Sequence, residues 1–583
     1  MPRLPLAEVI AAVEAEGLRL RAEFYRPQGP RGRRGSCPVD TEIEEALRVA
    51  LTKLIDCSFV GEETASTPGS VKGDVWIVDP HDGTFEFMSG RRGSAISVAL
   101  IRNGVPVLGV VHAPDPPDRG PDTIAWAEDA GPVRRNGLPI EKKFSDRKLQ
   151  PGDLVWATAS SAQRPETWSR AVAPARYVAM PSIAYRMARV AAGDGIATLS
   201  THAVCEYDIA AGMALIRGAG GVALDLQGNE IRLEGDGKRR LTGCFAGAPE
   251  AARKLARFDW ASLEQEPRRE PRVFFTFPRK AGPFLARAQG ALLGQVIGDS
   301  LGSRVEFKPA PEIARLFPQG VRELADGGVY HTLAGQPTDD SEMAFTLARA
   351  LLRLGRYDAE KVLDAYRAWL TSRPVDVGTT TEEGLLGMKK QESQSNGSLM
   401  RVSPIGIRAA GDPVLAARMA RDDSALTHPN DACLEACAAY CAAIAAGVAG
   451  ADRGAMVEAA LANSRGPARD AVERGAAGQV PEDFFTHQGW VLLALQNAFQ
   501  KLLHAKNFEE GLVETISYGG DTDTNAAIAG ALLGSFHSRD SIPARWIFAL
   551  LACRPLAECG ALRPRPAEYW PDDVLDLAEA LLQ

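Results

Sequence analysis

The chain has 583 residues. A single hydrophobic core stops growing beyond roughly 250–300 residues, so at least two domains are expected. Its 45% hydrophobic and 24% charged residues are typical of globular protein and exclude a disordered or fibrous chain. With 66 Lys and Arg against 74 Asp and Glu, the net charge of −8 gives no general attraction to nucleic acid or to an anionic membrane.

The first half of the chain is predicted to mix helices and strands. Helical patterns cover residues 4–25 and 41–55. Short apolar runs typical of strands follow at 75–78, 96–100 and 107–111. Asn103-Gly104, between the last two runs, is a strong signal for a β-hairpin.

The second half, from about Pro283, is predicted to be all-α. Its Ala- and Leu-rich helical patterns cover 286–301, 341–354, 359–370, 432–448 and 523–533. A charged, Pro-punctuated stretch at 264–271 is typical of a linker between the halves. The aromatic and basic residues that follow it suit either a nucleic-acid patch or a linker that packs its phenylalanines on a domain, and we favour the second.

The cysteines favour a reducing compartment. None of the nine forms a CxxC pair. Cys433, Cys437 and Cys441 share one helical face, which suits a metal site or, as we favour, buried small apolar side chains. The start of the chain has no clean apolar segment of a signal peptide, and the run 438–449 is too short and weak to span a bilayer. We therefore expect a cytoplasmic protein.

The densest chemistry of the first half is the segment Asp79-Pro80-His81-Asp82-Gly83-Thr84. A buried strand ends at Asp79, Asp82 follows three residues later, and Thr84 presents a hydroxyl at a predicted helix start. Converging carboxylates need a counter-charge, and hard divalent cations prefer oxygen ligands. The alternative is a helix-capping turn with solvated Asp side chains.

Two further motifs accompany this segment: Gly61-Glu62-Glu63 upstream, and residues 206–212 (EYDIAAG) downstream. Together, in this order, the three resemble the inositol monophosphatase superfamily, which includes 3'(2'),5'-bisphosphate nucleotidases and fructose bisphosphatases. The resemblance covers about residues 1–255. It implies a layered α/β sandwich and a phosphatase that uses two or three Mg²⁺ ions.

The same resemblance implies roles for individual residues. Asp40 and Thr84 orient and help deprotonate the attacking water, and Glu62 acts beside them. His81 offers its backbone carbonyl to a metal, so that its imidazole has no implied role. The implied metal ligands are Glu62, Asp79, His81, Asp82 and Asp208.

This half departs from the family pattern at three places. Tyr207 replaces the usual Trp, and Glu86 stands where Asn is common. Residues 180–184 (MPSIA) occupy the region of a small-residue substrate loop. The departures leave the substrate open.

The second half carries acids at two predicted helix starts: Thr338-Asp339-Asp340, and Asp521-Thr522-Asp523-Thr524. Acids are favoured at a helix N-terminus by the helix dipole and by capping, which is the alternative for either cluster alone. If the two clusters meet, they require cations, and their oxygen set suits two Mg²⁺ ions.

These helix starts resemble those of the ADP-ribosylglycohydrolase family, together with the glycines spaced every fourth residue over 290–302 and the segments at 377–381, 396–401 and 427–430. The resemblance covers about residues 284–583 and implies an all-α fold with a binuclear Mg²⁺ site. The implied ligands are Thr338, Asp339, Asp340, Asp521, Asp523 and Thr524.

The resemblance also implies substrate contacts. Gly397 and Ser398 would offer backbone N–H groups to a diphosphate, and Gly378 and Thr379 lie in another matching segment that we assign to substrate binding. Glu306 is our candidate acid/base, with a structural salt bridge as its alternative. His428 is expected to be a structural hydrogen-bonding residue.

The sequence thus predicts three parts: a phosphatase domain (1–255), a linker (256–283) and an ADP-ribosylglycohydrolase domain (284–583). Together they would form a bifunctional Mg²⁺-dependent hydrolase acting on a small phosphorylated nucleotide or ADP-ribose derivative, or on an ADP-ribosylated macromolecule, with no membrane and no strong nucleic-acid signal. Two alternatives remain. The first domain acts on inositol or sugar phosphates, or one domain is an inactive nucleotide sensor.

Overall fold

The computed structural model describes residues 3–33, 35–141, 144, 146–237, 239–260, 267–280 and 282–583. The chain divides into two compact units. Unit 1 runs to Pro271 and includes Phe275–Arg279, and unit 2 consists of Arg272–Phe274 and Lys280–Gln583. Residues 261–266 and 281 of the predicted linker (256–283) lie outside the described residues.

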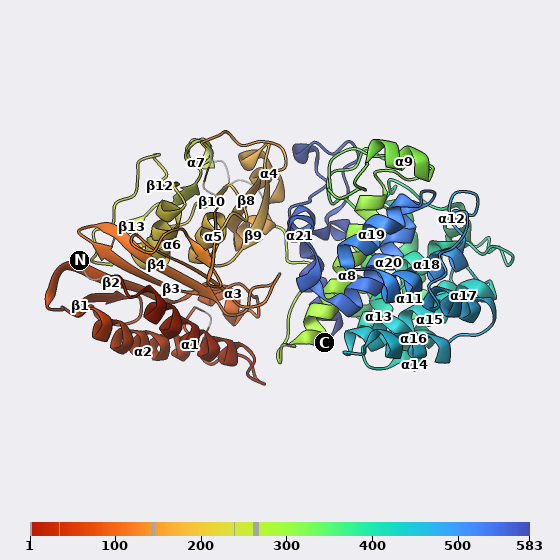
Figure 1. Ribbon diagram of the computed structural model, residues 1–583, viewed down its shortest axis with the longest axis horizontal. Helices are drawn as coiled ribbons and strands as arrows, with labels where there is room; N and C mark the ends of the chain where they lie inside the picture. The colour runs from red at the N-terminus through yellow and green to blue at the C-terminus, as the bar shows by residue number, and fades with distance from the viewer. Residues whose placement is uncertain are drawn as a thin grey trace. The chain divides into compact units, whose positions relative to one another are not determined.

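Unit 1 mixes helices and strands, as predicted (Figure 1). Its helices are α1 (Leu6–Phe24), α2 (Pro38–Leu54), α3 (Thr84–Met88), η1 (Ala159–Gln163), α4 (Pro165–Val172), α5 (Ile183–Ala191), α6 (Glu206–Gly218) and α7 (Pro249–Ala256). Its first seven strands are β1 (Cys57–Gly61), β2 (Val71–Asp82), β3 (Ala95–Arg102), β4 (Val105–Ala113), β5 (Asp122–Ala127), β6 (Arg134–Arg135) and β7 (Leu138–Pro139). The later ones are β8 (Leu154–Thr158), β9 (Arg176–Met180), β10 (Ala197–Ser200), β11 (Val204–Cys205), β12 (Val222–Leu224), β13 (Arg240–Leu241) and β14 (Cys244–Gly247).

The strands of unit 1 form two main sheets, which stack in alternation with helices. Within the described residues, the first sheet has the order β1-β2-β3-β4-β5-β6-β7 and the second has the order β12-β14-β10-β8-β9. Helices α1 and α2 contact one face of the first sheet, and α5 and α6 lie between the two sheets. Helices α4 and α7 contact the second sheet. The result is the layered α/β sandwich that the family resemblance implied.

Side-chain alternation fixes which residues face which layer of unit 1. Gly109 of β4 faces α6, because an added Cβ would lie 2.6 Å from the Ala211 carbonyl oxygen. His112, three residues later, faces α1, where it lies against Gly17. The sheet therefore separates α1 from α6. The Asn103-Gly104 turn, with positive φ at both residues, joins β3 to β4 as the sequence predicted.

Unit 2 is helical, and no strand occurs among its described residues. Its first helices are α8 (Pro283–Gly302), α9 (Ala310–Leu316), α10 (Asp339–Leu354), α11 (Ala359–Thr371), α12 (Thr379–Leu385), η3 (Asn396–Arg401), α13 (Ser403–Arg408), α14 (Pro413–Ser424), α15 (Asp431–Val448) and α16 (Arg453–Ala462). The remaining ones are α17 (Gly466–Ala476), α18 (Val491–His504), α19 (Phe508–Ser517), α20 (Thr522–His537), η4 (Arg539–Ser541), α21 (Ala544–Leu551), η5 (Ala557–Cys559), η6 (Ala567–Tyr569), η7 (Pro571–Asp573) and α22 (Val574–Leu581). The all-α prediction is confirmed.

Helices α8 and α20 are the most closely packed pair of unit 2 (Figure 1). A Cβ added to Gly294 would lie 2.1 Å from the carbonyl oxygen of Gly530, and one added to Gly298 would lie 2.1 Å from that of Ala526. The spacing of four residues puts these glycines on one helix face, where the absent side chains let the backbones approach. The approach brings Asp299 of α8 close to Asp523 of α20.

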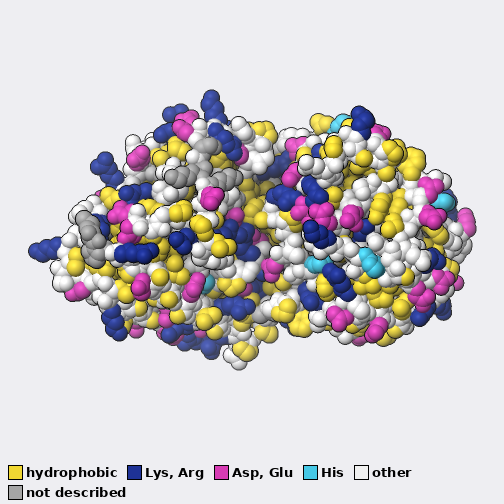
Figure 2. Space-filling view, viewed as in Figure 1, with side chains coloured by type: hydrophobic (Ala, Val, Ile, Leu, Met, Phe, Trp, Pro, Cys, Tyr) yellow, Lys and Arg dark blue, Asp and Glu magenta, His cyan; other side chains and the backbone are white. Residues whose placement is uncertain are grey.

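The segment after the predicted linker packs some of its aromatic rings on unit 1. Phe277 lies against Phe24, with ring centroids 6.3 Å apart, and the Arg279 guanidinium stacks 3.5 Å from the Phe275 ring centre. Phe274, assigned to unit 2, stays exposed. On the face drawn in Figure 2, basic and acidic side chains are interspersed over both units, as expected from the small net charge.

Helix α15 has the length and mean hydropathy of a membrane span, yet 83% of it is buried inside the protein. Its three cysteines lie in that buried face, where Cys433 and Cys441 donate to the backbone carbonyls of Ser395 and Val402. All nine cysteines, each within the described part of the chain, are free. Helix α15 is therefore a core helix whose cysteines serve as small apolar side chains.

Candidate functional site

Unit 1 gathers acidic side chains at one edge of its first sheet. Strand β2 ends at Asp82, and its parallel neighbour β1 ends at Gly61, opposite Val78, so that Glu62 follows β1 beside Asp79 of β2. Helix α6 adds Asp208 from its first turn. Carboxylate oxygens of Asp79, Asp82 and Asp208 all lie within 4.8 Å of one another.

This cluster strongly disfavours its own negative charge. Burial and the neighbouring carboxylates raise the pKa of Asp79 well above its usual range. Burial and the Asp82 charge raise the pKa of Asp208 to about 7, and partial burial with the Asp208 charge raises that of Glu62 to about 8. Asp79 Oδ2 is buried without a hydrogen-bond partner. A divalent cation fits this donor set, because it would neutralise the carboxylates and ligate the unpartnered oxygen.

Helix α5 holds one of these carboxylates in position. The Ser182 hydroxyl donates to Asp82 Oδ2 at 2.6 Å, and the Ala184 N–H donates to the same oxygen at 2.7 Å. The fully buried Arg186 guanidinium is electrostatically coupled to Asp82. The segment 180–184, which departs from the family pattern, thus anchors Asp82.

Asp40 and Thr84 both contact His81. Asp40 Oδ1 lies 2.7 Å from His81 Nδ1, and the Thr84 hydroxyl donates to the His81 carbonyl at 2.7 Å. The imidazole, to which no role was assigned, is fully buried, packs edge-on against Phe87 and leaves Nε2 without a partner. Among the described residues no direct hydrogen bond joins Asp40 to Thr84.

Unit 2 brings together its two acidic helix starts and adds a third acid from α8. Oxygens of Asp299, Asp340 and Asp523 lie within 4.8 Å of one another, as do those of Glu306, Asp521 and Asp523. Asp523 belongs to both groups, so the two are contiguous. The third acid, Asp299, was not predicted.

Asp299 fastens the start of α10. Its carboxylate accepts the backbone N–H groups of Thr338 and Ser341 at 3.1 Å and the Thr338 hydroxyl at 2.9 Å. The Thr338 hydroxyl is also 3.1 Å from Asp340 Oδ2. Asp299 of α8 therefore accepts hydrogen bonds from N–H groups at the start of α10, which have no partner within their own helix.

The clustered acids of unit 2, like those of unit 1, have raised pKa values. Burial and mutual repulsion raise the pKa values of Asp339, Asp340 and Asp523 well above the usual range. Burial and the Asp521 charge raise the pKa of Glu306 to about 8. Asp340 Oδ1 and Glu306 Oε2 are buried without partners, so this donor set also fits divalent cations.

Comparisons with known proteins identify both units. The sequence model of the ADP-ribosylglycohydrolase family matches residues 281–582, which is more than half of the chain, and that of the inositol monophosphatase family matches residues 37–258. The chain belongs to both families. The predicted fusion is confirmed, and because both families are hydrolases, the protein is an enzyme.

Relatives match each half separately. An ADP-ribosyl-[dinitrogen reductase] glycohydrolase of Rhodospirillum rubrum is 30% identical over 284 residues, 45% of this chain and 90% of the relative. An ADP-ribosylarginine hydrolase Tri1 of Pseudomonas putida is 27% identical, over 52% of this chain and 85% of the relative. A fructose-1,6-bisphosphatase/inositol-1-monophosphatase of Thermotoga maritima is 31% identical, over 33% of this chain and 72% of the relative.

The predicted substrate contacts of the glycohydrolase unit lie around α12 and η3. Gly378 precedes α12, whose first residue is Thr379. A Cβ at Gly397 would lie 2.6 Å from Thr381 Oγ1, so α12 and η3 touch there. The hydroxyl of Ser398 faces inward, because it accepts a 2.8 Å hydrogen bond from Ser424 and is fully buried. The Ser398 side chain is therefore committed to the interior of the unit.

His428 and Glu306 can be compared directly with their predicted alternatives. His428 bonds Thr427 through Nδ1 at 2.7 Å and Ser395 through Nε2 at 2.9 Å, and burial lowers its pKa to about 3. It is a neutral structural residue in this geometry. Glu306 forms no ion pair with any described residue, so the salt-bridge alternative finds no partner.

Sequence reasoning missed several residues of the glycohydrolase centre. Asn396 donates to Asp521 Oδ2 at 2.7 Å. The Asp376 charge raises the pKa of Glu306, and the Tyr330 hydroxyl lowers it. Asp299 had a signal, since an acid amid the small and apolar residues of 290–302 is costly to bury without a partner. Asn396 begins η3, in a segment that matched the family pattern but was assigned only backbone contacts, and Tyr330 and Asp376 lie outside the helices and strands.

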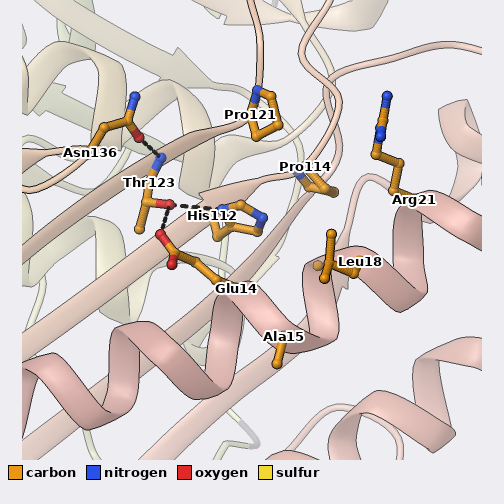
Figure 3. Close-up of a pocket in the computed structure, with 10 residues that line it drawn as sticks. Glu14, Ala15, Leu18, Arg21, His112, Pro114, Pro121, Thr123 and Asn136 are labelled. Atoms are coloured by element: carbon orange, nitrogen blue, oxygen red, sulfur yellow. Dashed lines mark hydrogen bonds between the residues drawn. The ribbon is translucent and has the colours of Figure 1, made fainter. Parts of the chain in front are cut away.

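A cavity of about 380 Å³ lies elsewhere in the inositol monophosphatase unit, against α1, on the sheet face opposite α6 (Figure 3). Thr123 donates to Glu14 Oε1 at 2.7 Å and therefore accepts from His112 Nδ1 at 2.9 Å. Burial lowers the pKa of His112 to about 4, so this imidazole is neutral. The cavity contains none of the clustered acids.

Proposed function

We propose that the protein is a bifunctional Mg²⁺-dependent hydrolase. Unit 1 removes a phosphate from a phosphorylated nucleotide or ADP-ribose derivative, and unit 2 hydrolyses the ribosyl glycosidic bond of an ADP-ribosylated substrate. One observation carries the proposal. Each unit, in a family of hydrolases, holds a buried carboxylate cluster with raised pKa values and an unpartnered oxygen.

The ligand chemistry supports magnesium. Both donor sets consist of oxygens, which hard divalent cations prefer: carboxylates with the His81 backbone carbonyl in unit 1, and carboxylates with threonine hydroxyls in unit 2. No cysteine or histidine side chain joins the clustered groups among the described residues. Bound ions would neutralise charge on the phosphate or the ribose oxygens and lower the pKa of water. We assign two or three ions to unit 1 and two to unit 2.

In unit 1, Thr84 Oγ1 would orient the attacking water. Its proton is donated to the His81 carbonyl, so Oγ1 can only accept a further hydrogen bond, as from a water. Asp40 would act through His81, whose ring it fixes from Nδ1. Glu62 flanks the cluster from the end of β1. His81 therefore links Asp40 to Thr84 by hydrogen bonds in place of a direct Asp40–Thr84 pair.

In unit 2, Glu306 would exchange a proton with the leaving group through its unpartnered Oε2. Backbone N–H groups of η3 at Gly397 and Ser398 would bind a diphosphate, and Gly378 and Thr379 would border it. Thr338, Asp339, Asp340, Asp521, Asp523 and Thr524 would hold the ions, and Asp299 would hold the start of α10 in position. The relatives from R. rubrum and P. putida are named for ADP-ribosylated protein and arginine substrates, which makes ADP-ribosylarginine our first candidate.

A second candidate for unit 1 is an inositol or sugar phosphate, which the name of the T. maritima relative favours. A third reading makes one unit an inactive nucleotide sensor. The complete carboxylate sets in both units count against the sensor. We assign both reactions to the cytoplasm, in keeping with nine free cysteines.

Two variants test the proposal in the full chain with Mg²⁺. Asp79→Asn should abolish phosphate release and spare ADP-ribose release, and Asp521→Asn should do the reverse. The assays are phosphate release from a nucleoside 3',5'-bisphosphate, from a phosphorylated ADP-ribose and from inositol 1-phosphate, and ADP-ribose release from an ADP-ribosylated arginine peptide. The proposal is wrong if the unaltered protein releases neither product.

A further inference from the structure

The segment Phe275–Arg279 packs on unit 1, although neither family match covers it. The inositol monophosphatase match ends at residue 258, and the ADP-ribosylglycohydrolase match begins at residue 281. Residues 272–274 and the chain from Lys280 onward belong to unit 2. The Arg279 side chain is buried, and Phe275 and Phe277 are half-buried. The segment is therefore a part of unit 1 that the family pattern does not account for.

Phe277 lies between the first helix of unit 1 and two turns. Its ring centre is 6.3 Å from that of Phe24 in α1. A Cβ added to Gly29, in the loop after α1, would lie 2.8 Å from the Phe277 ring. A Cβ added to Gly90, in the turn that follows α3, would lie 3.5 Å from Phe277 Cζ. Phe277 thus connects α1 with the end of α3.

Arg279 fastens the segment at the same turn. Its guanidinium stacks 3.5 Å from the Phe275 ring centre and lies 5.9 Å from the Phe24 ring centre. A Cβ added to Gly90 would lie 3.3 Å from Phe275 Cβ and 3.7 Å from Arg279 Nη1. Contacts between a cation and aromatic rings strengthen when the cation is shielded from water, as this buried guanidinium is.

A continuous row of aromatic rings leads from Phe277 to His81. The ring centres of Phe24 and Phe87 are 5.0 Å apart, and those of Phe87 and His81 are 4.3 Å apart with the rings edge-on. Phe24, Phe87 and His81 are all buried. Because protein interiors are close-packed, a gap left at one ring displaces its neighbours.

His81 is the point at which this row meets the phosphatase site. Its Nδ1 lies 2.7 Å from Asp40 Oδ1, and its carbonyl accepts the Thr84 hydroxyl at 2.7 Å. Its backbone N–H donates to Asp79 Oδ1 at 2.8 Å. The position of His81 therefore sets those of three groups assigned to the reaction or to a metal.

We propose that the segment Phe275–Arg279 is a positioning element of the phosphatase site. Phe277 supports the rings of Phe24 and Phe87, and these rings fix His81 together with the carboxylate and hydroxyl that it holds. The inference rests on the phosphatase activity proposed above for unit 1. Because the segment acts through other residues, it should change the rate of hydrolysis and leave the affinity for the ester unchanged.

This element lies in the stretch that connects the two units in the chain. Shortly after Arg279, Pro283 begins α8, the helix that carries Asp299. A phosphatase domain that ended at residue 258, where the family match ends, would lack the element. The connecting stretch is therefore a working part of the phosphatase as well as a tether.

The test compares Phe277→Ala and Phe277→Leu with Phe274→Ala, all in the full chain with Mg²⁺. The Phe274 side chain is 71% exposed and belongs to unit 2, so its truncation removes the same atoms without touching the row of rings. The substrate is whichever of adenosine 3',5'-bisphosphate, a phosphorylated ADP-ribose and inositol 1-phosphate the unaltered protein hydrolyses fastest.

Phe277→Ala should lower kcat for phosphate release by about tenfold with KM unchanged, since misplacing an orienting group by about 1 Å can cost about 100-fold. Phe277→Leu keeps part of the packing, so its kcat should fall between those of the alanine variant and the unaltered protein. Phe274→Ala should not change kcat. ADP-ribose release by unit 2 should be the same in all three variants.

Calorimetry establishes whether unit 1 is folded at the assay temperature. A folded Phe277→Ala variant with the kcat of the unaltered protein overturns the inference, even if its melting temperature is lower, because the ring would then serve stability alone. If the alanine variant does not fold, Phe277→Leu decides by the same criterion.

The two proposals fail separately. If the unaltered protein hydrolyses none of the esters, the phosphatase proposal is wrong, and hydrogen exchange of the His81 amide then decides the positioning inference. Faster exchange in the Phe277 variants than in Phe274→Ala supports it, and equal exchange overturns it.

Discussion

At the scale of single residues, Asp299 shows how a buried acid can organise a site through other residues. It is fully buried near the end of α8, where its carboxylate accepts hydrogen bonds from both Thr338 groups and from Ser341. These contacts set the direction in which Asp339 and Asp340 leave the start of α10. Asp299 is a positioning residue whose own oxygens also border the cluster.

Replacing Asp299 by Asn should weaken metal binding in unit 2. An amide offers one acceptor where two backbone N–H groups and a hydroxyl now donate, so the start of α10 loses its anchor. Loss of such supporting contacts costs about 10–100-fold in metal affinity. Titration of Mg²⁺ against ADP-ribose release measures it. Asp412→Asn, at the exposed N-cap of α14, is the matched control, and an equal loss there would contradict the assignment.

His112 should make unit 1 sensitive to mild acid. Its pKa is lowered to about 4 by burial, although Glu14 and Asp122 oppose the shift, whereas the unfolded chain takes up the proton near pH 6.5. Stability contributed by the neutral ring is complete above that value and is lost as the pH falls toward 4. From pH 7 to pH 5 the loss is about 2 kcal/mol in the free energy of unfolding.

Urea unfolding of the full chain at both pH values, followed by hydrogen exchange of the β4 amides, measures this loss. His112→Asn should reduce the difference, and His504→Asn, on the exposed end of α18, should not. An unchanged pH dependence in His112→Asn would assign the acid sensitivity to other groups.

At the scale of elements, the contact between α8 and α20 affects both the stability of unit 2 and the geometry of its acidic cluster. The same close approach that needs Gly294 and Gly530 delivers Asp299 and Asp523 to one cluster. Helix pairing therefore sets the distance between acids that are more than 200 residues apart in the sequence.

Gly294→Ala should destabilise unit 2 and weaken its metal binding together. The new methyl would lie 2.1 Å from the Gly530 carbonyl oxygen, so the helices must separate. Overpacking of this kind costs typically about 1–3 kcal/mol. Gly454→Ala in α16 meets only the Asp452 side chain at 3.4 Å and should cost nothing. Calorimetry measures the stability of unit 2, and Mg²⁺ titration measures its metal affinity. A destabilised variant with intact metal affinity would contradict the prediction that the two fall together.

At the scale of the whole molecule, two carboxylate clusters make the metal-free protein carry unfavourable charge in each unit. Repulsion among buried acids is released when cations bind, and ligands that bind only the folded state stabilise it. Each unit contains its whole cluster, so Mg²⁺ should stabilise the two units independently of each other.

Calorimetry of the full chain should resolve two transitions that both rise when Mg²⁺ replaces EDTA. At a concentration about 100 times the dissociation constant, the gain is about 2.7 kcal/mol for one site. Asp79→Asn should abolish the response of unit 1 alone, and its metal-free unit 1 should melt higher than that of the unaltered protein, because one repelling charge is gone. Loss of both responses in this variant would mean that the clusters are coupled.

The sequence by itself determined the fold class, the two families and the acids that stand in contiguous motifs, such as Asp79 with Asp82 and Asp521 with Asp523. Those signals are local, because strand patterns, glycine spacing and helix starts act over a few residues. Tertiary structure decided which residues serve the acids: Ser182 and Arg186 at Asp82, His81 at Asp40, and Asp299 and Asn396 in unit 2. Their partners lie up to 125 residues away, so only packing of the elements, through the α8–α20 contact and the stacked layers of unit 1, brings them into range.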